Sequence, residues 1–97
     1  MSDIERIKNN ILPILQRNDI DFAALFGSYA RNQARGDSDV DLLVRFNSPK
    51  SLFEIGDIER ILAQALGKDV DLVTEKSLSP YIKEDVLRES VVIYEKE

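Results

Sequence analysis

Two acidic pairs and one glycine-serine step are the residues of this sequence whose types and spacing can do chemistry. Ten residues separate Gly27 and Ser28 from the pair Asp39 and Asp41. Residues two apart on a strand project from the same face, so these two carboxylates are expected side by side, with Cα atoms about 6.6 Å apart. An oxygen-rich pair suits Mg²⁺ or Mn²⁺, which take carboxylates, water and substrate phosphates as ligands. The spacing therefore predicts a divalent-metal site.

The glycine-serine step is expected to hold an anion next to that metal. Gly27 allows the backbone to approach a ligand closely, and Ser28 stands where a strand is predicted to turn into a brief helix over Ser28–Ala34, closed by Gly36 and Asp37. The free N–H groups at the start of such a helix favour a phosphate. A phosphate-binding turn that faces a metal-binding acidic pair would form a nucleotide-binding site.

A second acidic pair supplies a candidate third carboxylate. Asp69 and Asp71 lie on one face of a predicted strand, and the spacing leaves open which of them points inward. We favour Asp71, because it lies deeper in the strand, whereas Asp69 directly follows the turn at Gly67 and Lys68. A third carboxylate would help to ligate the metal and could accept the proton of an attacking hydroxyl.

The elements that position these residues follow from hydrophobic periodicity and from turn residues. Helices and strands alternate in the order αβαβαβαβ, which predicts an α/β (α+β) domain with a small mixed sheet and helices packed on it. The expected strands are Asp21–Phe26, Asp39–Phe46, Asp69–Thr74 and Val91–Tyr94. The expected helices are one of about four turns from Ile4, kinked or broken near Leu12 by Pro13, then Ser28–Ala34, Ser48–Leu66 ending at Gly67, and one from Ser79-Pro80 to about Glu89.

Length and composition narrow the function. Ninety-seven residues suit one domain, 1–97. The absence of Cys and His excludes disulfides, thiolate or imidazole metal sites and Ser-His-Asp catalysis, so any metal must be held by oxygen, and a cytoplasmic location is expected. A net charge of −5 argues against nucleic acid as a partner. No signal peptide or long apolar run is present, so no membrane partner is expected.

The segment GSYARNQARGDSDVDLLVRF resembles the GSx(10)DxD signature of the minimal nucleotidyltransferases (MNT), the smallest members of the DNA polymerase β-like nucleotidyltransferase superfamily. The resemblance covers essentially the whole chain and implies a single palm-like MNT domain. Asn32 departs from the glycine common at this point of the family, which puts the local loop path in question. By resemblance, Gly27, Ser28 and Arg31 would bind the nucleotide phosphates, while Asp39, Asp41 and Asp71 would be the catalytic and metal-binding carboxylates.

The resemblance also implies a biological role. Such proteins are commonly antitoxins paired with a HEPN-domain ribonuclease toxin, and they transfer AMP from ATP to a tyrosine of that toxin. The resemblance thus implies an Mg²⁺-dependent (or Mn²⁺-dependent) protein adenylyltransferase with ATP as substrate and a HEPN toxin as partner. The alternative is an antitoxin that neutralises its toxin by complex formation, with a weak or inactive nucleotide site. The sequence leaves open whether the chain forms a homo-oligomer.

Overall fold

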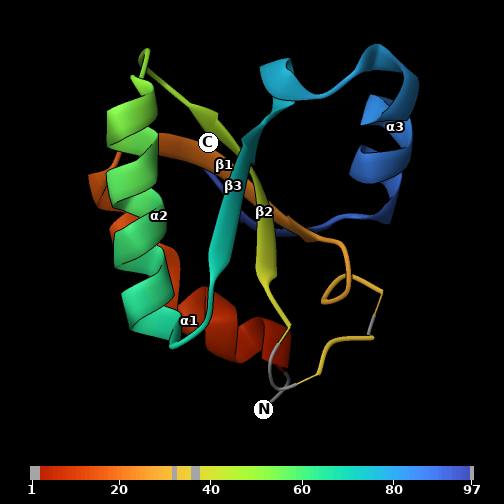
Figure 1. The fold of residues 1–97 in the computed structure, drawn as a ribbon, viewed down its shortest axis with the longest axis horizontal. Helices are drawn as coiled ribbons and strands as arrows, with labels where there is room; N and C mark the ends of the chain where they lie inside the picture. Colours follow the sequence, from red (N-terminus) through yellow and green to blue (C-terminus); the bar gives the residue numbers. More distant parts are fainter. Residues whose placement is uncertain (1–2, 32, 36–37, 97) are drawn as a thin grey trace.

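A four-stranded mixed sheet carries helices on both faces in the computed structural model, which describes residues 3–31, 33–35 and 38–96 (Figure 1). The strand order is β3-β2-β1-β4, in which β2 pairs with β3 in parallel and β1 pairs with β2 and β4 antiparallel. The mixed sheet confirms the expected fold class. The elements are α1 (Asp3–Arg17), β1 (Ile20–Phe26), β2 (Val40–Phe46), α2 (Leu52–Leu66), β3 (Val70–Thr74), the short 3₁₀ helix η1 (Glu75–Ser77), α3 (Pro80–Glu89) and β4 (Val91–Glu95).

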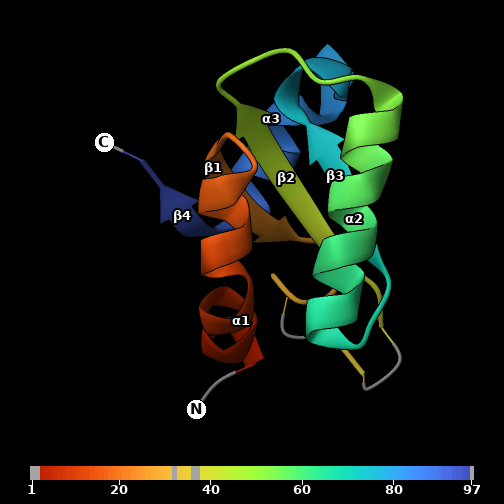
Figure 2. The same cartoon turned by 90° about the vertical axis from the view of Figure 1, so that its left-hand side faces the viewer.

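The two faces of the sheet are covered differently. Helices α1 and α2 lie side by side on one face, and α3 lies on the other (Figure 2). In β2, Val40 and Leu42 pack into the core beneath α1 and α2, whereas Leu43 packs with Phe22 toward α3. Because side chains alternate along a strand, Asp41 shares the face of Leu43. The acidic residue therefore lies on the face that α3 covers.

Local signals explain where α2 and α3 begin and end. Ser51 caps α2 and forms a reciprocal capping box with Glu54, and Gly67 ends the helix in a left-handed conformation with φ +69°. The prediction that this helix begins at Ser48 is wrong, because the capping box lies at Ser51. The hydroxyl of Ser79 caps α3 and Pro80 occupies its first turn, as expected.

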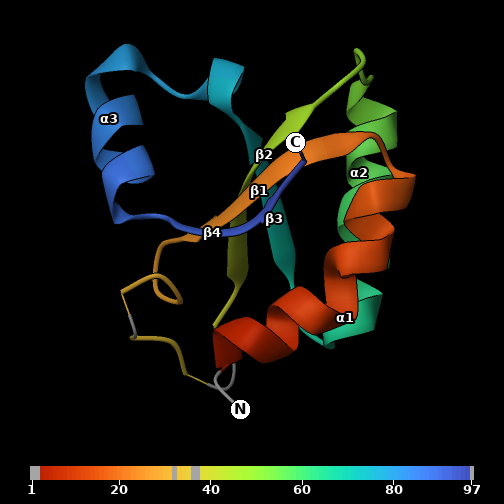
Figure 3. The ribbon, with the colours of Figure 1, turned by 180° about the vertical axis from the view of Figure 1, so that it is seen from behind.

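The first helix differs from the broken helix predicted around Pro13. Helix α1 is assigned as one uninterrupted element of 15 residues, and it bends along its length (Figure 3). Pro13 lies on the exposed side of α1, while Ile11 and Leu15 on the opposite side are fully buried. The kink is thus present without a break, because the apolar contacts continue through the bend.

The brief helix predicted over Ser28–Ala34 is wrong for the described residues. Residues 27–31 form turns, in which the Arg31 amide donates to the Gly27 carbonyl at 3.1 Å and the Gln33 amide donates to the Ser28 carbonyl at 2.8 Å. The second bond spans five residues and not four, so the described residues do not continue an α-helical ladder. Asn32, Gly36 and Asp37, which entered the prediction for this loop, lie outside the described residues.

Helix length also bears on the expectation about membranes. Within residues 3–31, 33–35 and 38–96, no helix is both long and apolar enough to span a bilayer.

Candidate active site

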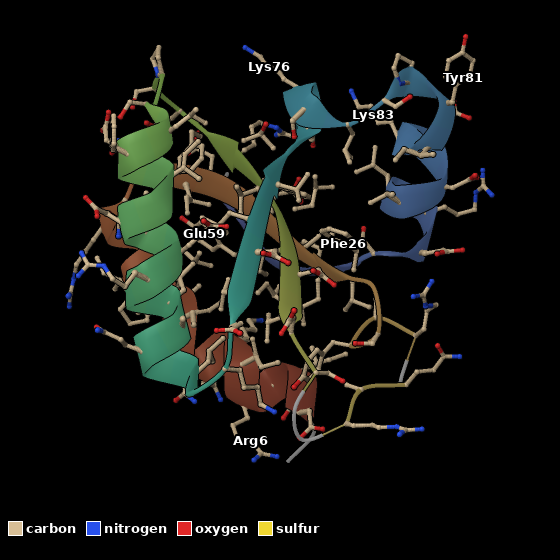
Figure 4. All side chains as sticks on the ribbon, viewed as in Figure 1. Arg6, Phe26, Glu59, Lys76, Tyr81 and Lys83 are labelled. Carbon is tan, nitrogen blue, oxygen red and sulfur yellow. The ribbon has the colours of Figure 1, made fainter. Side chains whose placement is uncertain are left out.

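The corner at the end of β1 brings Gly27 against the first acidic strand. Phe26, the last residue of β1, pairs with Asp41, and the next residue, Gly27, has φ +70°. A Cβ atom built on Gly27 would lie 2.5 Å from Oδ2 of Asp41, so any other residue here would push that carboxylate aside. Glycine lets the chain turn at positive φ while its backbone lies against the carboxylate in its present position. Figure 4 shows the neighbouring Phe26 side chain between β2 and α3.

The parallel pairing of β2 and β3 brings the second acidic strand to the same place. Asp41 lies opposite Asp71 in the register, and the Val40 amide donates to the Asp69 carbonyl at 2.9 Å just before the two strands begin to pair. Facing residues on neighbouring strands project from the same side of a sheet. Of the two acids left open by the spacing, Asp71 is therefore the one beside Asp41.

The electrostatics of Asp41 show that its neighbours are mostly acidic. Partial burial raises the pKa of the Asp41 carboxyl, and the negative charges of Asp71 and then Asp39 raise it further. A hydrogen bond with Asp71 acts in the same direction, while the guanidinium of Arg31 lowers the pKa. Desolvation and like charges both disfavour a carboxylate. The corner therefore holds more negative charge than one cationic side chain offsets.

The donor set of this corner fits a hard divalent cation, because all its charged ligands are carboxylate oxygens. Asp41 is half-buried, whereas Asp39, which precedes β2, and Asp71 are exposed. No three acidic side chains in the described part of the chain are gathered closely enough to ligate one ion as they stand. The hydrogen bond between Asp41 and Asp71 already brings two of the carboxyl groups together, and the exposed side chain of Asp39 can change rotamer toward a cation.

The predicted phosphate-binding residues surround the same corner. Gly27 and half-buried Ser28 form the turn itself, and Arg31 is exposed and close enough to Asp41 to lower its pKa. Residues 28–31, 33 and 34 form no helix, so a phosphate at this corner would meet backbone N–H groups of a turn and not those of a helix N-terminus. Tyr29, by contrast, is buried in the core, and the Lys68 ammonium lies 5.7 Å from its ring centre.

Comparison with known proteins places this geometry in a family. Residues 9–97 match the family described as polymerase beta nucleotidyltransferases. The chain belongs to this family. A Methanocaldococcus jannaschii protein named as a protein adenylyltransferase is 42% identical over 89 residues, which cover 92% of this chain and 96% of the relative. The protein adenylyltransferase MntA of Thermococcus cleftensis is 46% identical over 69 residues, covering 71% of this chain and 70% of MntA.

Solved structures agree with this membership. A structure named for a minimal nucleotidyltransferase has a TM-score of 0.79 at 36% identity and covers 93% of this chain and 95% of its own. A toxin-antitoxin structure with AMP-PNP has a TM-score of 0.81 at 27% identity, and the match covers 93% of this chain and 74% of the other. A tri-AMPylated Shewanella oneidensis HEPN toxin in complex with an MNT antitoxin contains a match of TM-score 0.75 at 25% identity, covering 96% and 73%. This chain is thus a nucleotidyltransferase of the MNT type, as its signature predicted.

One residue beside the site of this nucleotidyltransferase escaped the sequence analysis. The Leu72 amide donates to Oε2 of Glu59 at 2.8 Å, from β3 to the middle of α2 (Figure 4). Strand β3 is an edge strand, so its outward N–H groups have no neighbouring strand to bind. Glu59 accepts the hydrogen bond from the residue that directly follows Asp71, and it thereby fixes the strand that carries Asp71. An acidic residue within a helical apolar stripe was the only signal in the sequence.

Proposed function

We propose that this nucleotidyltransferase is the antitoxin partner of a HEPN toxin and transfers AMP from ATP to a tyrosine hydroxyl of that toxin. Three observations support the proposal: the MNT membership, the AMP-PNP and AMPylated-toxin complexes among its structural neighbours, and the acidic corner. The proposal rests mainly on the position of Asp41, whose carboxylate lies between the Gly27 backbone and Asp71.

In the proposed site, the chain binds and orients the triphosphate at the corner. The turn at Gly27 and Ser28 offers N–H groups to the phosphates, and the guanidinium of Arg31 can donate two parallel hydrogen bonds to one phosphate group. Asp39, Asp41 and Asp71 would hold Mg²⁺ or Mn²⁺. Such an ion, when bound, offsets the charge on the entering and departing oxygens.

The proposed reaction is an in-line displacement at the α-phosphorus. The tyrosine oxygen forms a bond to the α-phosphorus, the bond from that phosphorus to the bridging oxygen breaks, and pyrophosphate leaves. The tyrosine proton passes to a carboxylate, for which exposed Asp71 is the candidate. No histidine is needed for this scheme.

The open setting of the corner supports an acceptor carried by a partner. Asp39 and Asp71 are exposed, and neither the cavity lined by Arg45 and Lys83 nor the one lined by Tyr29 and Lys68 includes them. A partner protein can cover such a corner and exclude water from it.

The test is AMP transfer to the purified partner toxin, followed by intact-mass spectrometry. We expect Asp41→Asn and Asp39→Asn to lower the transfer rate by more than about 100-fold, because each removes charge at the metal site. The matched control is Asp69→Asn, an exposed acid directly before β3, which should keep most of the activity. Undiminished transfer by Asp41→Asn would contradict the assigned site. A wild-type chain that inhibits the toxin without modifying it would instead support neutralisation by complex formation.

A further inference from the structure

A cavity with cationic walls lies at the opposite end of β2 and β3 from the acidic corner. This basic cavity has a volume of about 680 Å³. Its lining includes Arg45 near the end of β2, Lys50 before α2, Lys76 in η1 and Lys83 in α3. Because β2 and β3 are parallel, their first residues carry Asp41 and Asp71, and their last residues border the cavity.

The charge of the basic cavity is opposite to that of the chain. Four of the chain's 13 Lys and Arg residues line it, with Glu75 as the single acid, although the net charge of the chain is −5. Arg45 pairs with Glu75 at 3.0 Å and Lys50 pairs with Asp19 at 2.8 Å. A concave surface on which one sign of charge is in excess focuses the field and attracts the opposite charge.

Lys76 and Lys83 differ from the other two cations of the basic cavity. Neither has a carboxylate within ion-pair distance among residues 3–31, 33–35 and 38–96. Figure 4 shows both side chains at the same end of the sheet, from η1 and from the start of α3. Both ammonium groups are therefore available to a negatively charged ligand.

Apolar side chains border the same cavity. Val44 and Phe46 of β2 and Ile55 in the first turn of α2 belong to its lining. Apolar side chains among polar ones are typical of surfaces that contact another protein.

We propose that the basic cavity docks an acidic segment of the partner toxin. The inference rests on the proposed function, since that function supplies the partner. The mixture of cationic and apolar side chains in the lining favours a peptide over a nucleic acid, whose contacts are mainly with phosphates. The negative charge of the chain as a whole also repels a polyanion.

The geometry allows docking and reaction to occur at separate contacts. Arg45 follows Asp41 by four residues on the same strand, so the two side chains share a face and their Cα atoms are about 13 Å apart. A partner seated in the basic cavity can extend along that face to present a tyrosine at the acidic corner. Docking would then raise the effective concentration of the acceptor without taking part in the chemistry.

The test is the affinity of the purified chain for the purified partner toxin, measured by titration calorimetry. The double variant Lys76→Glu, Lys83→Glu should weaken binding more than tenfold, because it places two negative charges against an acidic segment. Its affinity for Mg²⁺ with AMP-PNP should be unchanged. The control Lys8→Glu, Arg17→Glu makes the same change in net charge on exposed positions of α1 and should alter toxin affinity less than threefold. Equal effects of the two double variants would overturn the proposal.

Additional measurements distinguish a failure of the docking proposal from a failure of the proposed AMP transfer. Asp41→Asn should keep the toxin affinity of the wild type while losing AMP transfer. If the wild type binds the toxin through the basic cavity but transfers no AMP, docking stands and the proposed chemistry fails. If the wild type does not bind the toxin, docking fails. Loss of binding to a labelled 20-nucleotide RNA in the double variant, with toxin affinity unchanged, would assign the cavity to nucleic acid and also overturn the proposal.

Discussion

The backbone of Gly27 and the carboxylate of Asp41 occupy adjoining space, and this contact defines the candidate active site. A Cβ at Gly27 would meet Oδ2 of Asp41 at 2.5 Å, whereas a Cβ at Gly67, which has nearly the same φ, would meet nothing within 4 Å. The two glycines therefore share the backbone requirement and differ only in what lies beside them. That difference allows the contact to be tested separately from the turn.

We expect Gly27→Ala and Gly67→Ala to lower the free energy of unfolding by similar amounts, about 1–2 kcal/mol, because both force alanine into the left-handed region. The carboxylate of Asp41 can swing away from a new methyl group, so the clash adds little to stability. It displaces the acid, however, and AMP transfer should fall at least tenfold in Gly27→Ala alone. Urea unfolding and transfer rates check this. Equal activity in the two variants would show that the contact does not matter.

Strand β3 depends on α2 for more than apolar packing. Glu59 accepts the Leu72 amide at 2.8 Å on the open edge of the sheet, one residue beyond Asp71. The position of Asp71 against Asp41 thus rests on a backbone pairing on one side and a side-chain hydrogen bond on the other. Glu59 is a positioning residue, since it acts through the strand and not on substrate.

We expect Glu59→Ala to lower the free energy of unfolding by about 1 kcal/mol, because a partly buried N–H group loses its acceptor. The transfer rate at saturating ATP should fall several-fold with little change in the KM for ATP, since Asp71 is displaced while the phosphate turn is intact. Glu59→Gln retains an acceptor oxygen and should restore most of both properties. A purely structural role would lower stability in Glu59→Ala and leave its turnover number unchanged.

The molecule as a whole is polarised along its sheet, with acids at one end and most of the basic cavity at the other. At the basic end, Asp19 joins the start of β1 to the segment before α2. Its carbonyl accepts the Asn47 amide at 2.8 Å, and its carboxylate accepts Lys50 at 2.8 Å. Asp19 adopts φ +61°, a left-handed conformation that Asp and Asn tolerate better than most residues. Hydrogen bonding to Lys50 lowers the pKa of Asp19, and the same bond raises the pKa of Lys50.

These two shifts set the pH dependence of stability at that end. A lowered pKa in the folded state adds stability above the unfolded pKa of Asp19 and loses it as the pH falls through the folded value. Asp19→Asn keeps the left-handed residue but removes the charge, so it should be less stable than the wild type at pH 7, and the difference should shrink as the pH approaches 3. Because the pair is exposed, we expect a small effect, which 1 M NaCl reduces. Urea titrations at pH 7, 5 and 3 check this, and a difference that grows on acidification would contradict it.

Several features followed from local sequence. The strands coincide with β-branched and apolar runs, Gly67 ends α2, and Ser79-Pro80 starts α3, because caps and alternation act over a few residues. The helix expected over Ser28–Ala34 failed because tertiary contacts of the corner override a weak helical preference. Ser-Pro at Ser48 is a common signal for a helix start, but α2 begins at Leu52 because Ser51 forms the capping box.

The sequence by itself determined the chemistry that this protein can carry. Without His or Cys, a glycine-serine step and paired aspartates leave only oxygen ligation and phosphate binding. The tertiary structure decided which groups meet: Asp71, and not Asp69, faces Asp41, Glu59 holds the edge strand, and four distant cations line one cavity. These pairings depend on strand register and on contacts between residues far apart in the chain, and neither is encoded in any short segment.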